Sequence, residues 1–134
     1  MLVPCVKEKL KHRAKAEDLY VSPLFRLSLA YARQLAPSLI FVLSAKYGLV
    51  ALTQEIDPYD VTLNEMPSHA VKEWAEAVLA QLRLQADTAN DHFVFLAGAR
   101  YRRYLIPHLR SHAVPLQGLR LGEQLQYLKG RLDG

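Results

Sequence analysis

The sequence has a single cysteine, Cys5, among its 134 residues. One cysteine cannot form an internal disulfide and is typical of a reducing compartment, so we expect a cytoplasmic protein. Long apolar segments are also missing, because no stretch approaches the roughly 20 residues that a membrane-spanning helix requires. The first residues, MLVPCVKEKLKHRAK, place no charged segment ahead of an apolar one, which argues against a secretory signal. We therefore expect no membrane partner.

Sequence motifs for common metals and cofactors are absent as well. The five histidines have no HExxH spacing and no CxxC partner, so a zinc site is not expected. The lack of GxGxxG and GxxxxGK[ST] argues against NAD-type cofactors and P-loop ATP use, and the lack of GxSxG argues against a serine hydrolase. We predict neither a metal nor a cofactor.

Positive charge is in moderate excess, with 17 Lys and Arg against 13 Asp and Glu. Five of the basic residues lie in KEKLKHRAK (7–15), and ARYRRY (99–104) adds three. Basic clusters with interleaved tyrosines suit a polyanion, since cations contact phosphates and aromatic rings stack on bases. A solvated loop and an exposed helix face would give the same pattern. The partner that we expect is nucleic acid, DNA rather than RNA, and the oligomeric state, monomer or dimer, stays open.

Internal repeats, low-complexity tracts and flexible linkers are lacking, which predicts a single α/β domain over residues 1–134. Short apolar runs alternate with helical stripes along the chain. Ser22-Pro23 has the composition of a helix start, and Ser68 is expected to cap a helix whose apolar face includes Trp74. The predicted strands cover 1–6, 39–43, 93–97 and 113–115, the predicted helices begin near 22, 68, 99 (with a bend at Pro107) and 122, and 45–67 is expected to be irregular.

This alternation predicts a three-layer sandwich, with about four mostly parallel strands and helices on both faces. The carboxyl ends of parallel strands meet at one edge of a sheet, and ligands bind in the crevice at that edge. Polar residues follow three of the predicted strands, and Gly98 marks the end of the third. We therefore expect three segments to converge on one rim: Lys7 and Lys9; Ser44, Lys46 and Tyr47; Arg100 and Tyr101.

The segment FVLSAKYGLV (41–50) supplies one candidate part of a site. Ser44 and the backbone around Gly48 can form hydrogen bonds to a base or a phosphate, and Lys46 offers a positive charge. Alternatively the segment is a turn, in which Ser44 caps local backbone groups and Lys46 only extends along the surface.

The segment EIDPYD (55–60) supplies the carboxylates. Asp57 precedes a proline and so prefers an extended conformation, which would hold Tyr59 and Asp60 in a stiff, projecting loop. A carboxylate beside a stacking tyrosine could activate water or stabilise a cationic sugar. A structural ion pair is the alternative. Cys5 is most simply a small buried residue, although the lysines that follow it could make its thiol reactive.

Six motifs, taken in order, resemble a family of small bacterial and phage proteins of unassigned function: PCVKEK, AEDLYVSPLFR, LSAKYGLV, IDPYDVTL, LAGARY and PLQGLRLGEQLQYL. The resemblance covers nearly the whole chain. More distantly, the arrangement is similar to the archaeosine synthase domain, which resembles the uracil-DNA glycosylase fold, and to the peroxide-stress DNA-binding family. Of the Gly-Gln-Asp-Pro-Tyr loop of uracil-DNA glycosylases, IDPYD keeps only Asp-Pro-Tyr.

These resemblances imply a nucleobase-handling enzyme that cleaves or exchanges the N-glycosidic bond of a modified base, as in DNA repair. The alternatives are a non-catalytic nucleic-acid-binding module in stress response or phage defence, and an enzyme acting on a free nucleotide or base. The expected catalytic residues are Asp60, with Asp57 in reserve, and Lys46. The expected binding residues are Cys5, Lys7, Lys9, Ser44, Tyr47, Gly48, Tyr59, Gly98, Arg100 and Tyr101.

Overall fold

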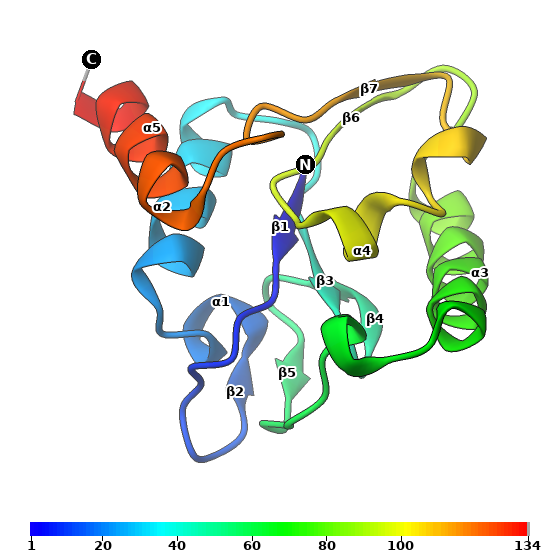
Figure 1. The fold of residues 1–134 in the computed structure, drawn as a ribbon, viewed down its shortest axis with the longest axis horizontal. Helices are drawn as coiled ribbons and strands as arrows, with labels where there is room; N and C mark the ends of the chain where they lie inside the picture. Colours follow the sequence, from blue (N-terminus) through cyan, green and yellow to red (C-terminus); the bar gives the residue numbers. More distant parts are fainter. Residues whose placement is uncertain (134) are drawn as a thin grey trace.

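The structure is a computed structural model and describes residues 1–133. The chain forms short strands and helices in mixed order (Figure 1). In chain order the elements are β1 (Leu2–Pro4), β2 (Ala14–Lys15), α1 (Ala16–Leu19), α2 (Pro23–Gln34), β3 (Phe41–Ser44), β4 (Gly48–Ala51), β5 (Glu55–Ile56), the 3-10 helix η1 (Leu63–Glu65), α3 (Ser68–Gln85), β6 (His92–Val94), α4 (Ala99–Arg102), the 3-10 helix η2 (Ile106–His108), β7 (Ser111–Ala113) and α5 (Leu121–Asp133).

The strands confirm the α/β class but not a single, mostly parallel sheet between two helical layers. Within residues 1–133 they group into three small sheets, β1-β3-β4, β2-β5 and β6-β7. The β1-β3 and β6-β7 pairs are parallel, whereas β3-β4 and β2-β5 are antiparallel. A reversal of the chain at Gly48 causes part of the difference, because its φ of 74° allows a tight turn directly after β3. The segment 45–67, expected to be irregular, therefore contains β4 and β5.

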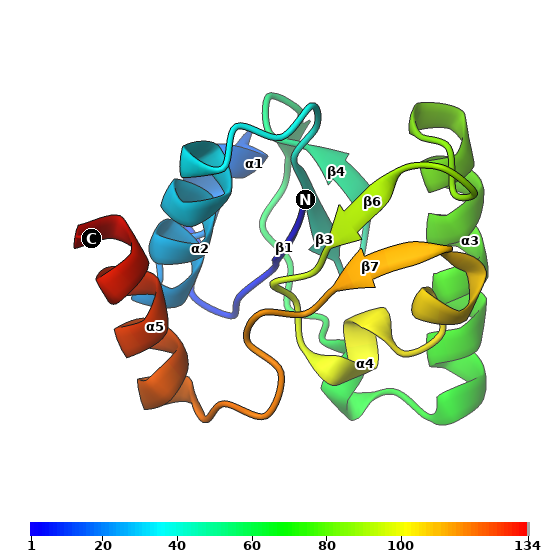
Figure 2. The same ribbon diagram turned by 90° about the horizontal axis from the view of Figure 1, so that it is seen from above.

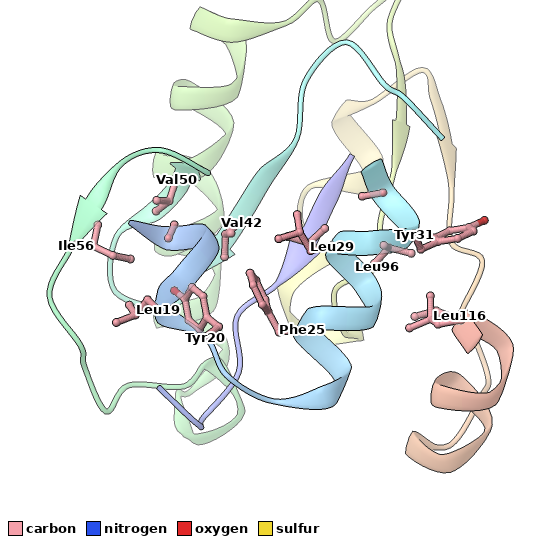
Figure 3. Close-up of a cluster of buried hydrophobic side chains, with 14 residues drawn as sticks. Leu19, Tyr20, Phe25, Leu29, Tyr31, Val42, Val50, Ile56, Leu96 and Leu116 are labelled. Atoms are coloured by element: carbon pink, nitrogen blue, oxygen red, sulfur yellow. The ribbon is translucent and has the colours of Figure 1, made fainter. Parts of the chain in front are cut away.

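Side chains of β1 and β3 alternate between two hydrophobic clusters, as the two-residue period of a strand requires. Val3 and Val42 belong to a cluster that includes Phe25 and Leu29 of α2, and Figure 3 shows part of it. Leu2 and Leu43, together with Phe41, belong to a second cluster that contains the apolar face of α3. Figure 2 shows α2 and α5 on one side of these strands and α3 on the other.

The predicted helix boundaries have mixed outcomes. Ser22 caps α2 as predicted, because its hydroxyl accepts the backbone N–H of Phe25 at 3.2 Å. The prediction for Ser68 is wrong: Pro67 occupies the cap position of α3, and its side chain cannot accept a hydrogen bond. The helix expected from residue 99 is divided into α4 and η2, and Pro107 lies in η2. Within residues 1–133, no helix has both the length and the apolar character needed to cross a bilayer.

Candidate functional site

A cavity of about 460 Å³ lies between the segment that follows β1 and the segment that leads into η1. We call it the Lys9–Asp60 cavity. Its size falls within the range of small-molecule sites. Its lining residues are Cys5, Val6, Lys7, Lys9, Asp60, Val61, Thr62, Asn64, Glu65 and Tyr101.

Charges of both signs line the Lys9–Asp60 cavity. Lys7 and Lys9 come from the segment after β1, and Asp60 and Glu65 come from the facing segment. Lys7 and both carboxylate residues are exposed, whereas Lys9 is half-buried. Two ammonium groups and two carboxylates suit a ligand with both acceptors and donors better than they suit a bare phosphate.

Lys9 is held in a partly desolvated position. Its Nζ lies 4.4 Å from the centroid of the Tyr59 ring and 5.8 Å from that of Tyr20, and it donates a hydrogen bond to the carbonyl oxygen of Lys7 at 3.3 Å. Burial lowers the pKa of Lys9 below its usual value, although the nearby Cys5 and Asp60 act in the opposite direction.

The hydroxyl groups of Ser44, Tyr59 and Tyr20 form a hydrogen-bonded chain next to Lys9, which contacts the Tyr59 ring. The Ser44 hydroxyl donates to the Tyr59 hydroxyl at 2.8 Å, and the Tyr59 and Tyr20 hydroxyls are 2.7 Å apart. Burial raises the pKa of Tyr20 to about 12 and also raises the pKa of Tyr59. Both phenols are therefore neutral at physiological pH, and they link three segments of the chain by hydrogen bonds.

Two neighbouring residues of α4 fix the opposite wall. The Tyr101 hydroxyl accepts the backbone N–H of Leu63 at 3.3 Å and lies 3.4 Å from the Thr62 hydroxyl. Burial is the main cause that raises the pKa of Tyr101 to about 12. Arg100 donates from Nε to the carbonyl oxygen of Leu63 at 2.8 Å and from its terminal nitrogen to the carbonyl oxygen of Met66. Arg100 thus anchors the η1 segment, and two of its donor groups are occupied there.

The turn Ser44–Gly48 lies outside the cavity lining. The Ser44 hydroxyl accepts the backbone N–H groups of Lys46 and Tyr47 at 3.3 and 3.0 Å, and the Ser44 carbonyl accepts the indole N–H of Trp74 at 2.9 Å. Lys46 is exposed, with its Nζ 5.3 Å from the centroid of the Tyr47 ring. This geometry matches the alternative interpretation of the segment, in which Ser44 caps the backbone of a turn.

Asp57 and Gly98 also lie away from the cavity lining. Asp57 pairs with Arg13 at 3.3 Å, and both side chains are more than half exposed, which agrees with the ion-pair interpretation. Gly98 has an ordinary negative φ and open space where a Cβ would be, so the backbone does not require glycine there.

The structure therefore divides the predicted site residues into three groups. The Lys9–Asp60 cavity brings together Cys5, Lys7, Lys9, Asp60 and Tyr101. Ser44 and Tyr59 belong to the hydroxyl chain next to Lys9. The residues outside the lining are Lys46, Tyr47, Gly48, Asp57, Gly98 and Arg100.

Sequence reasoning missed several lining residues, among them Thr62 and Asn64. A local sequence signal could have predicted the cap at Thr62, because threonine is a common residue at the start of a helix. In the structure the Thr62 hydroxyl accepts the backbone N–H of Asn64 at 3.2 Å. Tyr20 was missed because its partner Tyr59 is 39 residues away. Within residues 1–133, no three His, Cys, Asp or Glu side chains gather closely enough to hold a metal ion.

Comparison with protein families matches residues 1–130 to a model described as a family of unknown function (DUF6884). No curated protein and no solved structure matches the chain. The match agrees with the resemblance to a family of unassigned function. The more distant likenesses, to the archaeosine synthase domain and to the peroxide-stress family, stay predictions.

Proposed function

Since the chain belongs to this family of unknown function, its activity has to be inferred from its site, and we propose that it is a nucleobase-handling enzyme of the cytoplasm. The proposed reaction cleaves or exchanges the N-glycosidic bond of a modified base in nucleic acid, with DNA preferred to RNA. The proposed place of reaction is the Lys9–Asp60 cavity.

The observation that carries the proposal is that Asp60 lines the cavity without an ion-pair partner among residues 1–133. Asp57, by contrast, is paired with Arg13. An unpaired carboxylate at a ligand cavity can orient water, or stabilise the positive charge that develops on the sugar as the base leaves. Asp60 is therefore assigned the catalytic role, and Asp57 a structural one.

The rest of the cavity supports handling of a base. Its volume of about 460 Å³ is sufficient for one nucleoside, and its polar lining includes Thr62, Asn64 and Tyr101. Such an enzyme takes the target base out of the stack and recognises its edge by hydrogen bonds. Lys7 is exposed at the cavity, and in this proposal its ammonium group contacts a flanking phosphate.

The strand pairings support a finer description of the fold as well. Leu2 of β1 also forms a parallel bridge with Phe95, just beyond β6, and the Leu96 N–H donates to the Leu2 carbonyl at 2.9 Å. We interpret β7, β6, β1, β3 and β4 as one mixed layer between helices. The cavity then lies beside the carboxyl end of β1, where ligands bind in α/β proteins.

A non-catalytic nucleic-acid-binding module is the second candidate. The exposed basic side chains of the segment 7–15 favour it, because Lys11, Arg13 and Lys15 are at the surface beside the cavity segment. Such a module needs the cations but not the carboxylate of Asp60. Its binding would weaken steeply with salt and would not be accompanied by turnover.

The test is base release from oligonucleotides that carry modified bases, comparing Asp60→Asn with Asp57→Asn as the matched control. We expect Asp60→Asn to lower the rate by about 100-fold or more, a typical contribution of an acid or base group, with oligonucleotide affinity retained. Asp57→Asn should release base at nearly the wild-type rate. Equal loss in both variants, or activity in Asp60→Asn equal to wild type, would contradict the assigned role. Binding without release by the wild-type protein would favour the second candidate, and turnover of free nucleotides alone would indicate a nucleotide enzyme.

A further inference from the structure

Lys9 differs from the other lysines of the chain in its surroundings. The sequence has seven lysines, all within the described residues 1–133, and Lys9 alone is half-buried while the other six are exposed. Its Nζ is held between the face of the Tyr59 ring and the Lys7 carbonyl oxygen, and no carboxylate pairs with it within residues 1–133. The position of this amine is thus fixed without an ion pair.

The cavity also favours reaction at this amine. Burial lowers the pKa of Lys9, so a larger fraction of the side chain is free amine at neutral pH than for an exposed lysine. A lysine whose amine is desolvated in a pocket is a common way for a protein to form Schiff bases with carbonyl compounds. Asp60 lines the same cavity and acts on Lys9 through its charge, which places a proton carrier near the amine.

We infer that Lys9 is a nucleophile that forms a Schiff base with an aldehyde, and that the aldehyde is the open-chain sugar of an abasic site in nucleic acid. The inference rests on the proposed function for the source of this aldehyde. Breaking an N-glycosidic bond leaves a sugar hemiacetal at the former attachment carbon, and its open-chain form carries an aldehyde there. Since Asp60 is assigned to act on the sugar, this carbon would react in the same cavity that Lys9 lines.

The step balances without any further reactant. The Lys9 ammonium first gives one proton to Asp60 or to water, and the amine lone pair then forms a C–N bond as the carbonyl π bond breaks. The resulting carbinolamine loses its oxygen as water, with the proton returned by Asp60. The products are a protonated imine and one water molecule, and no oxidation or reduction takes place.

The experiment is reductive trapping with an oligonucleotide that contains one abasic site, in the presence of sodium borohydride. The covalent adduct of the wild-type protein is digested, and the modified lysine is identified by mass spectrometry. We expect the adduct on Lys9. Lys9→Arg, which keeps the charge, should lower the yield by at least about tenfold, and Lys129→Arg, at an exposed lysine of α5, should not change it. Adducts spread over the exposed lysines, or an unchanged yield in Lys9→Arg, would overturn the inference.

Mapping on the wild-type protein does not depend on whether a variant folds. The outcome is also separable from that of the proposed function. An adduct on Lys9 without release of any base would support this amine chemistry and contradict the glycosylase proposal. Base release with no adduct on Lys9 would support the glycosylase proposal and overturn the Schiff base.

Discussion

The Ser44–Gly48 turn follows β3, and the Lys9–Asp60 cavity is lined by segments that follow β1 and β5, but the polar groups of the two places have different partners. In the turn, the Ser44 hydroxyl and carbonyl are bound to Tyr59, Trp74 and the local backbone, and Ser44 is fully buried. In the cavity, Asp60 is exposed and unpaired within residues 1–133. Polar residues at the end of a strand therefore indicate a site only where their partners are not already supplied by the protein.

The largest stability effect should come from Gly48→Ala, which tests the structural role of the turn. Gly48 has a φ of 74°, and a Cβ there would overlap the side-chain oxygen of Gln81, which accepts the Leu49 N–H at 2.9 Å. Left-handed backbone costs about 1–2 kcal/mol for alanine and a lost hydrogen bond about 1 kcal/mol, so we expect a loss of about 2–3 kcal/mol. Urea unfolding measures it.

Gly98→Ala is the matched control, because Gly98 has a negative φ and open space around its Cβ position. Its free energy of unfolding should stay within about 0.5 kcal/mol of wild type, as for most surface substitutions. A similar loss in the free energy of unfolding for Gly48→Ala and Gly98→Ala would contradict the structural role assigned to Gly48.

A smaller loss is expected from Ser44→Ala. The variant removes the acceptor of the Tyr47 N–H and the donor to the Tyr59 hydroxyl. Leaving these partly buried groups unpaired costs about 2 kcal/mol. Thr62→Ala, which affects an N–H at the exposed Asn64, should cost less in the same urea titration. A larger loss of stability in Thr62→Ala than in Ser44→Ala would contradict the view that polar groups of the turn have the greater structural role.

The smallest of these effects is a pH dependence from Tyr20. Its pKa is raised to about 12 by burial, so above pH 10 the unfolded chain ionises while the folded protein keeps its proton. Stability from this group is complete below pH 10 and is lost as the pH rises toward 12, by about 1 kcal/mol at pH 11. Urea unfolding from pH 8 to 11 should show a shallower decline for Tyr20→Phe than for wild type. Equal declines would contradict the burial of this phenol.

Local patterns in the sequence were sufficient for most elements of the fold. Ser22-Pro23 marks the start of α2, and the spacing from Val71 to Leu82 gives the buried face of α3. These signals depend on residues within a few positions of one another. The antiparallel strand β4 was not predicted, because it depends on the backbone conformation of Gly48, and a continuous apolar run does not reveal strand direction.

The candidate site was predictable only in part, for the same reason. Lys9 was predicted from its place after an expected strand and Asp60 from the segment EIDPYD (55–60), and both line the cavity. The structural role of Asp57 depends on Arg13, 44 residues earlier, and that of Ser44 depends on Trp74, 30 residues later. Such partners cannot be read from local composition, so occupied and free polar groups look alike in the sequence.

Alkylation of Cys5 tests the central claim, that the Lys9–Asp60 cavity is the ligand site, most directly. Cys5 lines the cavity and is the single cysteine of the chain, so N-ethylmaleimide reports on this place alone. We predict that an oligonucleotide with an abasic site slows the labelling of Cys5 in proportion to the fraction of protein bound, as measured in parallel by fluorescence anisotropy. Labelling of fully bound protein at the rate of the free protein would contradict the claim.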